Sequence, residues 1–449
     1  MNKLVDFPYS HVLVLGLAKS GTAATQVLLD SGIHVRVNDL KANNEDDVVQ
    51  ELRTLGAEVV VGSHPLSVLD NIDLIVKNPG IPYENVILKE AVNRDIPIIT
   101  EIELASQLAE GTIIGITGSN GKTTTTMLIY EMLIASEAPV KLAGNIGIVA
   151  TEVAKDLGQD ERLVLELSSF QLMGIKKFRP KIAVLLNIFE AHLDYHKTLD
   201  NYKEAKSNIF LNQLEDDYLI YNADEPNVSD ASRKARSIKV PFSVSVKQEN
   251  GAWVDSENLY FKEERVIALK DIVLVGTHNL ENILAAVCAA KLSGATNKGI
   301  SKVLKTFSGV THRLQFIANK NERLIYNDSK ATNILATQKA LSSFAQPTIL
   351  LAGGLDRGNG FDDLIPYLKN VKGIVVFGET AEKLKNTAEK AGINAITHAE
   401  NVEDAVIKAY GMSEPGDVIL LSPACASWDQ YKTFEERGDM FIQAVHTIE

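Results

Sequence analysis

Short runs of Val, Ile and Leu recur along the chain and alternate with stretches whose apolar positions are spaced as on one face of a helix. Such runs are typical of strands buried on both faces of a parallel sheet, and their alternation with helices predicts βαβ units. In the first hundred residues we expect strands at 11–15, 35–38, 59–61, 74–76 and 96–99.

The same alternation continues through the rest of the chain. The middle stretch predicts strands at 112–117, 163–167, 182–186 and 218–221, and an Ala-rich buried helix at 279–292. A third stretch follows Phe307-Ser308-Gly309 and predicts strands at 324–326, 348–351, 373–377 and 418–421. Because a domain has about 150 residues, a chain of 449 residues suggests roughly three domains.

Composition narrows the class of protein. The 45% apolar and 23% charged content is that of an ordinary globular chain, and the net charge of −13 argues against binding nucleic acid or anionic membranes. The N-terminus lacks the apolar run of a signal peptide, and no stretch is apolar enough for a membrane span. Two cysteines, Cys288 in an apolar helix and Cys425 in a loop, cannot build a disulfide framework. We therefore expect a cytoplasmic protein.

The first candidate phosphate loop is Gly16-Leu17-Ala18-Lys19-Ser20-Gly21, directly after the first predicted strand. It matches a dinucleotide-binding fingerprint except that Ala18 replaces the glycine that normally lets the backbone approach a pyrophosphate. Asp39 ends the second strand at the spacing where an acidic residue meets a ribose hydroxyl. The N–H groups of the following helix can still bind a diphosphate. The alternative is a strand–helix turn that binds no ligand.

A second loop, Gly115-Ile116-Thr117-Gly118-Ser119-Asn120-Gly121-Lys122-Thr123-Thr124, joins a β-branched strand to a helical run. Glycines let backbone N–H groups surround phosphate oxygens, Lys122 supplies a positive charge, and the Thr123 hydroxyl can ligate Mg²⁺. The spacing departs from the common P-loop, because Gly115 lies one residue too far from Gly121.

These features predict an α/β protein of three domains, with boundaries near residues 100 and 305. The prediction is a Rossmann-like N-terminal domain at 1–100, a central P-loop ATPase-type domain with a parallel sheet at 101–305, and a Rossmann-like C-terminal domain at 306–449.

Further motifs follow the second loop in a fixed order. They are Ala143–Gly147, Leu165–Leu172, Asn187-Ile188 with His192-Leu193-Asp194, Lys206, Gly276–Asn279, His312-Arg313 and Asn327–Asn333. The loop and this order resemble the Mur ligase family, which adds amino acids to the peptidoglycan precursor, and the resemblance spans all three predicted domains. The runs 328–333 and 422–427 are most similar to members that add D-glutamate to UDP-N-acetylmuramoyl-L-alanine.

The resemblance implies an ATP-dependent amide ligase of cell wall synthesis, and hence of cell shape and division. The substrate carboxylate takes the γ-phosphoryl group of ATP, and the amine of D-glutamate attacks the acyl phosphate, releasing phosphate. The implied partners are these three small molecules, bound by a monomer that contacts neither nucleic acid nor membrane. The implied cofactors are ATP, two Mg²⁺ ions and a carbamylated lysine.

The resemblance also implies roles for individual residues. Those implied for catalysis are Lys122, Asn145, Glu166, His192 and Lys206. ATP would contact Gly118, Ser119, Asn120, Gly121, Lys122, Thr123, Thr124, Asn279, Arg313 and Asp328. The metal ligands would be Thr123, Glu166, His192 and carbamylated Lys206. The UDP-sugar would contact Leu17, Ala18, Asp39, Gly80 and Asn145, and D-glutamate would contact Lys330, Thr332, Arg357, Ser427 and Phe434.

Several of these roles have a plainer alternative on the residues alone. Glu166 lies within an apolar strand, where an unpaired carboxylate is costly, so a metal site is favoured over a carboxylate that escapes at a strand edge. Lys206 by itself is typical of a surface lysine, and His192 could form a two-histidine pair with His196, although Mg²⁺ prefers oxygen. Arg357 departs from the family pattern, since better-known members have a lysine there.

Alternative functions stay open at this point. Within the superfamily they are an alanine-adding muramate ligase and a folylpolyglutamate synthetase. From other classes they are a P-loop switch, in which Glu166, His192 and Lys206 would be superfluous, and a nicotinamide dehydrogenase, which rests on the first loop only.

Overall fold

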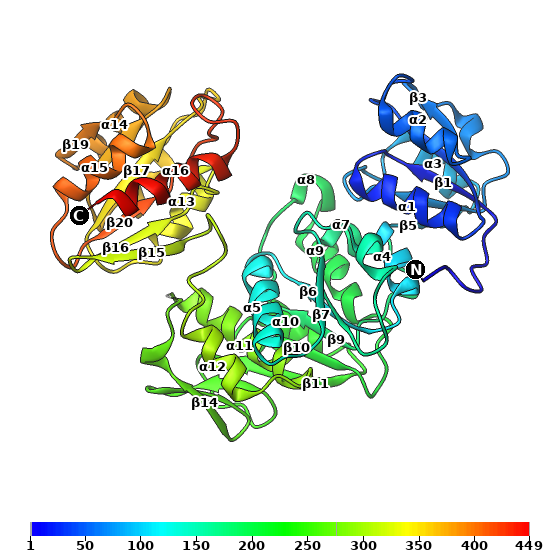
Figure 1. Ribbon diagram of the computed structural model, residues 1–449, viewed down its shortest axis with the longest axis horizontal. Helices are drawn as coiled ribbons and strands as arrows, with labels where there is room; N and C mark the ends of the chain where they lie inside the picture. Colours follow the sequence, from blue (N-terminus) through cyan, green and yellow to red (C-terminus); the bar gives the residue numbers. More distant parts are fainter. Residues whose placement is uncertain (1, 275, 449) are drawn as a thin grey trace. The chain divides into compact units, whose positions relative to one another are not determined.

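The computed structural model describes residues 2–274 and 276–448, and within them the chain forms two compact units. The first unit comprises Met1–Ile272 and His278–Lys305, and the second comprises Val273–Thr277 and Thr306–Glu449. A five-stranded and a nine-stranded sheet lie in the first unit, and a six-stranded sheet lies in the second (Figure 1). The domain boundaries near 100 and 305 stay predictions.

The five-stranded sheet is parallel, in the order β3-β2-β1-β4-β5. Its strands are β1 (His11–Leu15), β2 (His34–Asp39), β3 (Glu58–Val61), β4 (Leu74–Lys77) and β5 (Ile98–Ile99). Its helices are α1 (Lys19–Asp30), α2 (Asp47–Thr54), α3 (Val86–Asn93) and α4 (Glu101–Leu108), with a short 3₁₀ turn, η1 (Leu66–Leu69). The strand order reverses between β1 and β4, and ligands bind at such a switch point, beyond the carboxyl ends of the strands.

Both faces of this sheet are covered, which explains the uninterrupted apolar runs. In β1, Val12 and Val14 pack into the cluster that includes residues of α1, whereas Leu13 and Leu15 pack into the cluster that includes residues of α3. The alternation of side chains along a strand therefore places apolar residues on both sides.

The nine-stranded sheet has the order β14-β13-β12-β11-β10-β9-β6-β8-β7, with the strand of the second loop, β6, between β8 and β9. Its strands are β6 (Thr112–Thr117), β7 (Val140–Gly144), β8 (Arg162–Glu166), β9 (Ile182–Leu185), β10 (Tyr218–Asn222), β11 (Ile238–Ser243), β12 (Ala252–Val254), β13 (Asn258–Phe261) and β14 (Glu264–Ala268). Its helices are α5 (Lys122–Ala135), α6 (Ala150–Ala154), α7 (Ser169–Leu172), α8 (Leu193–His196), α9 (Leu199–Ser207), α10 (Pro226–Ser232), α11 (Thr277–Leu292) and α12 (Asn297–Leu304), with 3₁₀ turns η2 (Asn208–Phe210) and η3 (Leu269–Asp271).

The strands predicted in this sheet, β6, β8, β9 and β10, are confirmed, and so is the buried Ala-rich helix, α11. The sequence did not predict β7, β11 or the antiparallel strands β12 to β14. β7, β11, β13 and β14 carry charged or polar residues, and β12 has only three residues. β11 also contains Pro241, which argues against a strand because it cannot donate to the ladder.

The six-stranded sheet has the order β15-β16-β20-β17-β18-β19. Its strands are β15 (Gln315–Lys320), β16 (Arg323–Asn327), β17 (Thr348–Gly353), β18 (Val371–Phe377), β19 (Ala395–His398) and β20 (Val418–Leu421). Its helices are α13 (Ile334–Leu341), α14 (Ala381–Lys390), α15 (Val402–Met412) and α16 (Phe434–Thr447), with a 3₁₀ turn, η4 (Asp362–Tyr367). The two edge strands, β15 and β19, were not predicted, because they are short of apolar residues and only partly buried.

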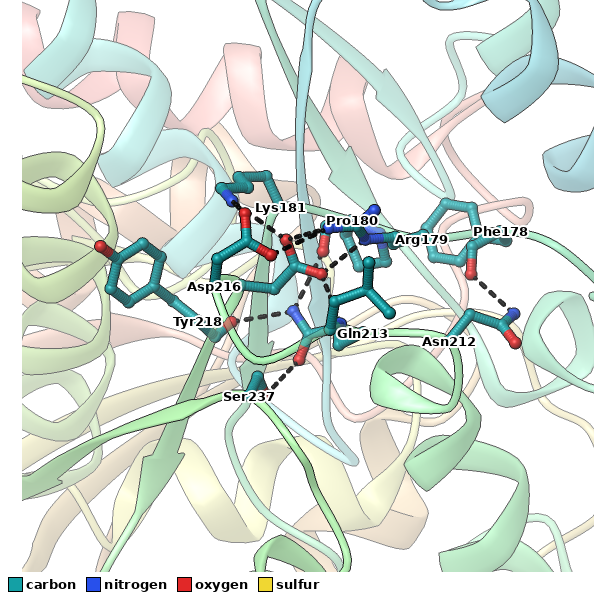
Figure 2. A network of polar contacts seen from close by, with 11 residues as sticks. Phe178, Arg179, Pro180, Lys181, Asn212, Gln213, Asp216, Tyr218 and Ser237 are labelled. Atoms are coloured by element: carbon teal, nitrogen blue, oxygen red, sulfur yellow. Dashed lines mark hydrogen bonds and ion pairs between the residues drawn. The ribbon is translucent and has the colours of Figure 1, made fainter.

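A polar network fastens the segment before β9 to the segment before β10 (Figure 2). The buried Asp217 accepts hydrogen bonds from Arg179 Nε at 2.6 Å and from the backbone N–H of Leu214 at 2.7 Å. The Gln213 amide donates to the carbonyls of Pro180 and Tyr218, both at 3.0 Å. The network anchors the chain that follows α9, the helix that carries Lys206.

The fold class is confirmed as α/β, with parallel sheets in both units apart from antiparallel edges. None of the helices in residues 2–274 and 276–448 combines the length and the apolar character that crossing a bilayer requires.

Candidate active site

The loop between β6 and α5 has the shape of a phosphate-binding loop. Gly121 ends the loop in the left-handed region (φ 80°), and a Cβ there would lie 2.1 Å from Asn282 Oδ1. At Gly118 a Cβ would lie 2.9 Å from the Cβ of Leu186. Both glycines are therefore required by close contacts, and Asn282 on α11 is a neighbour of the loop that sequence reasoning did not select.

Two lysine amines meet at one carbonyl of this loop. Lys122 Nζ and Lys206 Nζ each donate to the carbonyl oxygen of Gly118 at 2.8 Å. Lys206 is only 1% exposed, and its amine also lies 4.6 Å from the centre of the Tyr202 ring. Burial, and then the charge of Lys122, hold the pKa of Lys206 well below its usual range. Lys206 is thus not the surface lysine that spacing alone would favour.

The loop is fixed by Asn187, which lies two residues after the end of β9. The Asn187 side chain accepts a hydrogen bond from the backbone N–H of Asn120 at 2.8 Å and donates to the Asn120 carbonyl at 3.2 Å. The Asn187 carbonyl accepts from the N–H of Ser119 at 2.9 Å. Sequence reasoning did not assign Asn187 a role, although its place just after a central strand was a usable signal.

Glu166 ends β8, beside β6, with Ile116 as its partner in register. Its side chain is buried, and Oε1 accepts a hydrogen bond from Asn145 Nδ2 at 3.1 Å. Its Oε2 has no hydrogen-bond partner among the described residues. A buried carboxylate oxygen without a donor is costly, so this atom fits a cation ligand.

His192 precedes α8 in a left-handed backbone conformation (φ 55°), and its ring lies 5.2 Å from the ring of Phe170. Burial, and then the charge of Lys206, lower the pKa of His192. Burial likewise lowers the pKa of His196 to about 4. Because His196 Nε2 lies 3.0 Å from Ser169 Oγ, that ring nitrogen is already engaged.

The predicted magnesium ligands combine one carboxylate, one imidazole, the hydroxyl of Thr123 and a modified Lys206. Across the described ranges there is no cluster of three or more His, Cys, Asp or Glu side chains that could hold a metal. The predicted set does not depend on such a cluster, since only Glu166 and His192 belong to these residue types.

The first loop and the turn after β4 come together at the switch point of the N-terminal sheet. Leu17 N–H donates to Asp39 Oδ2 at 2.7 Å, and Ala18 is the N-cap residue of α1. Gly16 has a φ of 99°, and a Cβ there would lie 3.0 Å from the Cβ of Asn78, which starts the turn containing Gly80. The predicted UDP-sugar contacts of this sheet thus lie close together.

Asp39 holds this loop as a carboxylate. Burial alone would raise its pKa, but hydrogen bonds from the N–H groups of Leu17, Ala42 and Lys41 outweigh burial, and the pKa of Asp39 is lowered. Because Leu17 is one of its donors, the carboxylate orients the loop itself.

The predicted ATP contacts are divided between the units. Asn279 lies on α11 in the first unit, buried, and its Oδ1 accepts from Asn282 Nδ2 at 3.4 Å. Arg313 and Asp328 lie in the second unit, where Asp328 accepts hydrogen bonds from the Ser422 hydroxyl at 2.9 Å and the Leu314 N–H at 3.1 Å. Burial raises the pKa of Asp328 to about 7.

A cavity of about 390 Å³ in the second unit brings together two of the five residues predicted for D-glutamate. Thr332 and Arg357 line it, as do Ala426 and Cys425 from the segment after β20. The hydroxyl of the next residue, Ser427, is buried and has no hydrogen-bond partner within the described ranges.

The other two predicted D-glutamate residues, Lys330 and Phe434, contact each other, with the Lys330 amine 4.9 Å from the Phe434 ring centre. Neither lines the cavity.

Sequence reasoning missed Arg437, a fully buried guanidinium behind this cavity. Its Nη2 donates to the carbonyls of Ser329 at 2.8 Å and Cys425 at 3.1 Å, and its Nε lies 3.0 Å from Ser329 Oγ. Burial lowers the pKa of Arg437 to about 10. Arg437 thus ties together the segments that follow β16 and β20, and only its tertiary contacts distinguish it from the other charged residues of α16.

Models of three protein families match consecutive stretches of the chain. The Mur ligase MurD-like N-terminal domain matches residues 10–100, the Mur ligase middle domain matches 116–290, and the Mur ligase glutamate ligase domain matches 312–425.

Several relatives match the chain over all or nearly all of its length, and two of them, both named UDP-N-acetylmuramoylalanine--D-glutamate ligase, serve as examples. The one from Oceanobacillus iheyensis is 63% identical over 448 residues, which is 100% of each chain. The one from Geobacillus kaustophilus is 60% identical over 444 residues, which is 98% of each chain. Among solved structures, the MurF ligase from Thermotoga maritima in complex with ADP covers 92% of this chain and 95% of its own, with 20% identity and a TM-score of 0.57. That likeness shows the fold alone.

Proposed function

This chain belongs to the Mur ligase family, and on that premise we propose that it joins D-glutamate to UDP-N-acetylmuramoyl-L-alanine at the expense of ATP. It is an acid–D-amino-acid ligase of peptidoglycan precursor synthesis, and it releases ADP and phosphate. The observation in the structure that carries the chemistry is the meeting of two lysine amines at Gly118 O, in a loop that follows a central strand.

The reaction needs an acyl phosphate because a free carboxylate repels a nucleophile and has no good leaving group. Transfer of the γ-phosphoryl group spreads negative charge over its oxygens, and that charge must be neutralised. Lys122 supplies a cation to these oxygens, and the N–H groups of the loop from Gly118 to Gly121 donate to the phosphates. Asn145 holds Glu166 through the bond to Oε1 and presents its amide to the reacting acyl group.

Thr123, Glu166, His192 and carbamylated Lys206 would hold the two Mg²⁺ ions. The unpartnered Oε2 of Glu166 supports this assignment, since a buried carboxylate oxygen without a donor favours a cation. When bound, Mg²⁺ supplies positive charge for the transferred phosphoryl group and the acyl oxygen.

Carbamylation of Lys206 requires a neutral amine that attacks CO₂, forming an N–C bond and losing a proton. Burial and the nearby Lys122 lower the pKa of Lys206, which increases the neutral fraction. The product is an anion with two oxygens, in place of a buried cation. We expect Lys206→Ala to be nearly inactive and to be partly rescued by acetate or formate. Full activity of the unrescued variant would exclude the carbamate, and Lys203→Ala on the same helix is the matched control.

The substrates take the remaining residues. The UDP-sugar lies against Leu17, Ala18, Asp39, Gly80 and Asn145, so that backbone N–H groups and local contacts bind an anion on an acidic protein. Asn279, Arg313 and Asp328 contact the nucleotide of ATP. D-Glutamate lies against Lys330, Thr332, Arg357, Ser427 and Phe434; the unpartnered hydroxyl of Ser427 supports this pocket.

The assignment is tested by measuring phosphate release with all three substrates and with each one left out. We expect release only with ATP, UDP-N-acetylmuramoyl-L-alanine and D-glutamate together, and no absorbance change with NAD(P)H. Equal turnover with L-glutamate, or turnover without the nucleotide sugar, contradicts the assignment. The acyl phosphate is tested with ¹⁸O in the muramoyl carboxylate, because one labelled oxygen must then appear in the released phosphate.

The protein acts in the cytoplasm, as a monomer, without nucleic acid or membrane insertion. The two cysteines are unpaired, which suits a reducing compartment. Sedimentation at micromolar concentration tests the monomer, and fractionation of cells tests the compartment.

A further inference from the structure

Trp428 lies beside the D-glutamate cavity and is 65% exposed. Exposure alone calls for no explanation, since single apolar residues are common on protein surfaces. Its contact does call for one, because the Cζ of Arg357 lies 5.2 Å from the centre of the indole ring. Arg357 lines the cavity, whereas Trp428 does not, so Trp428 reaches the cavity only through Arg357.

The contact with Trp428 is the one interaction that the Arg357 guanidinium makes within residues 2–274 and 276–448, where it has neither an ion pair nor a hydrogen bond. The adjacent Asp356 is bound elsewhere: it pairs with Lys383 at 2.7 Å and accepts from the Gly358 N–H at 2.8 Å. Asp429, next to Trp428, accepts from the backbone N–H of Glu379 at 3.2 Å. The guanidinium therefore has no carboxylate to satisfy it among the described residues.

Stacking on an aromatic ring leaves the N–H donors of a guanidinium free, whereas pairing with a carboxylate uses them. The ring restrains the plane of the guanidinium by cation–π attraction but uses none of its five N–H donors. A carboxylate would restrain the guanidinium equally well, but it would occupy the fork of N–H donors that could otherwise bind a ligand. The Trp428–Arg357 pair is thus a restrained guanidinium with its donors open to the cavity.

We propose that Trp428 is a positioning residue, which holds the fork of Arg357 where it receives one carboxylate of the amino-acid substrate. The inference rests on the proposed function and deepens it, because it concerns the choice of amino acid. If Thr332 and Ser427 bind one end of the substrate, a restrained Arg357 fixes the distance to its second carboxylate. Aspartate is one methylene shorter and cannot reach both, whereas a mobile arginine would follow it.

The test is a double-mutant cycle on the full-length enzyme, with Trp428→Ala, Arg357→Ala and the double variant. KM is measured separately for D-glutamate, ATP and the nucleotide sugar, and kcat/KM for D-aspartate is compared with that for D-glutamate. We expect Trp428→Ala to raise KM for D-glutamate about two- to fivefold, as expected for one exposed cation–π contact. The other two KM values stay unchanged, and the preference for glutamate over aspartate falls.

In the Arg357→Ala background, Trp428→Ala should have no further effect, and Trp428→Phe should retain most of the wild-type behaviour. Ile407→Ala, which removes another exposed apolar side chain of the same unit, is the matched control. Equal effects of Trp428→Ala in both backgrounds, or no effect in either, would overturn the inference. If instead the wild-type enzyme does not use D-glutamate, the proposed function itself fails.

Discussion

Lys77 ends β4 beneath the turn that contains Gly80, and replacing it with methionine tests how a buried charge shapes the UDP-sugar site. Lys77 is only 1% exposed, and no carboxylate pairs with it within the described residues. Its amine donates to the carbonyls of Asn78 at 3.3 Å and Pro79 at 3.2 Å, and lies 5.1 Å from the Tyr83 ring centre. Burial lowers the pKa of Lys77 from 10.5 to about 8.

This pKa fixes the sign and the size of a pH effect on stability. Between pH 8 and 10.5 the unfolded chain binds the proton more tightly than the folded chain, so the folded state gains stability as the pH rises. One pKa unit corresponds to about 1.4 kcal/mol. The lowered pKa of Lys77 therefore reduces the stability of the folded state by about 3 kcal/mol at pH 7 and by about 1.4 kcal/mol at pH 9.5. The wild type should therefore gain about 2 kcal/mol relative to Lys77→Met over this range.

Urea unfolding followed by circular dichroism at pH 7 and pH 9.5 measures this difference. Lys89→Met, on the exposed side of α3, controls for the loss of one positive charge. Because the thioether of the Lys77→Met variant cannot donate to the two carbonyls of the turn, KM for the nucleotide sugar should also rise in the variant. A stability difference that stays the same at both pH values would refute the reasoning from burial.

Three further predictions concern other buried polar groups. Asp217→Asn should destabilise the protein by about 2–3 kcal/mol in urea unfolding. This is at or below the usual loss of stability when a buried ion pair is broken, because Arg179, the partner of Asp217, is 38% exposed. Burial raises the pKa of Glu101 to about 7. The folded chain therefore holds its proton more tightly than the unfolded chain. In thermal unfolding the wild type should lose stability relative to Glu101→Gln, which keeps an acceptor for the Thr151 N–H, as the pH rises from about 4.5 to about 7, with no further change above pH 7. Ser427→Ala removes an unpartnered hydroxyl, so it should not lower the melting temperature, but KM for D-glutamate should rise about tenfold or more in steady-state assays.

Most strands that could be predicted are buried on both faces, although the partly buried edge strand β3 was also predicted from its run of three valines. In β1, β4, β6 and β20 nearly every residue is buried, so the run of apolar residues is enough to predict the strand. The strands that were missed lie toward the edges, where one side meets water. At these edges the segment adopts a strand because it pairs with a neighbouring strand, and a single sequence contains no signal of that pairing.

The candidate site divides along a similar line. The loop around Lys122 was predictable because its glycines, its lysine and its position after a strand all lie within one short segment. The contact of Lys206 with Gly118, and that of Trp428 with Arg357, join segments that are distant along the chain. Asn187 and Arg437 were missed for the same reason, since only the packed structure tells which of many similar residues is buried at the loop.

Two of the side-chain atoms that are buried without a hydrogen-bond partner in the described residues lie where ligands are proposed to bind, whereas four others, in Thr126, Thr151, His196 and Asn297, do not. Glu166 Oε2 and Ser427 Oγ are buried without a partner among the described residues, and Lys206 is buried without a carboxylate there. Each such group costs free energy in the folded protein, on the order of 1–3 kcal/mol for a neutral one and more for a charge. A protein that only had to fold would replace them with apolar residues. Their cost is recovered when a cation meets Glu166, when CO₂ turns the Lys206 amine into an anionic carbamate that a cation can bind, and when a carboxylate accepts from Ser427, so each bound ligand also stabilises the fold.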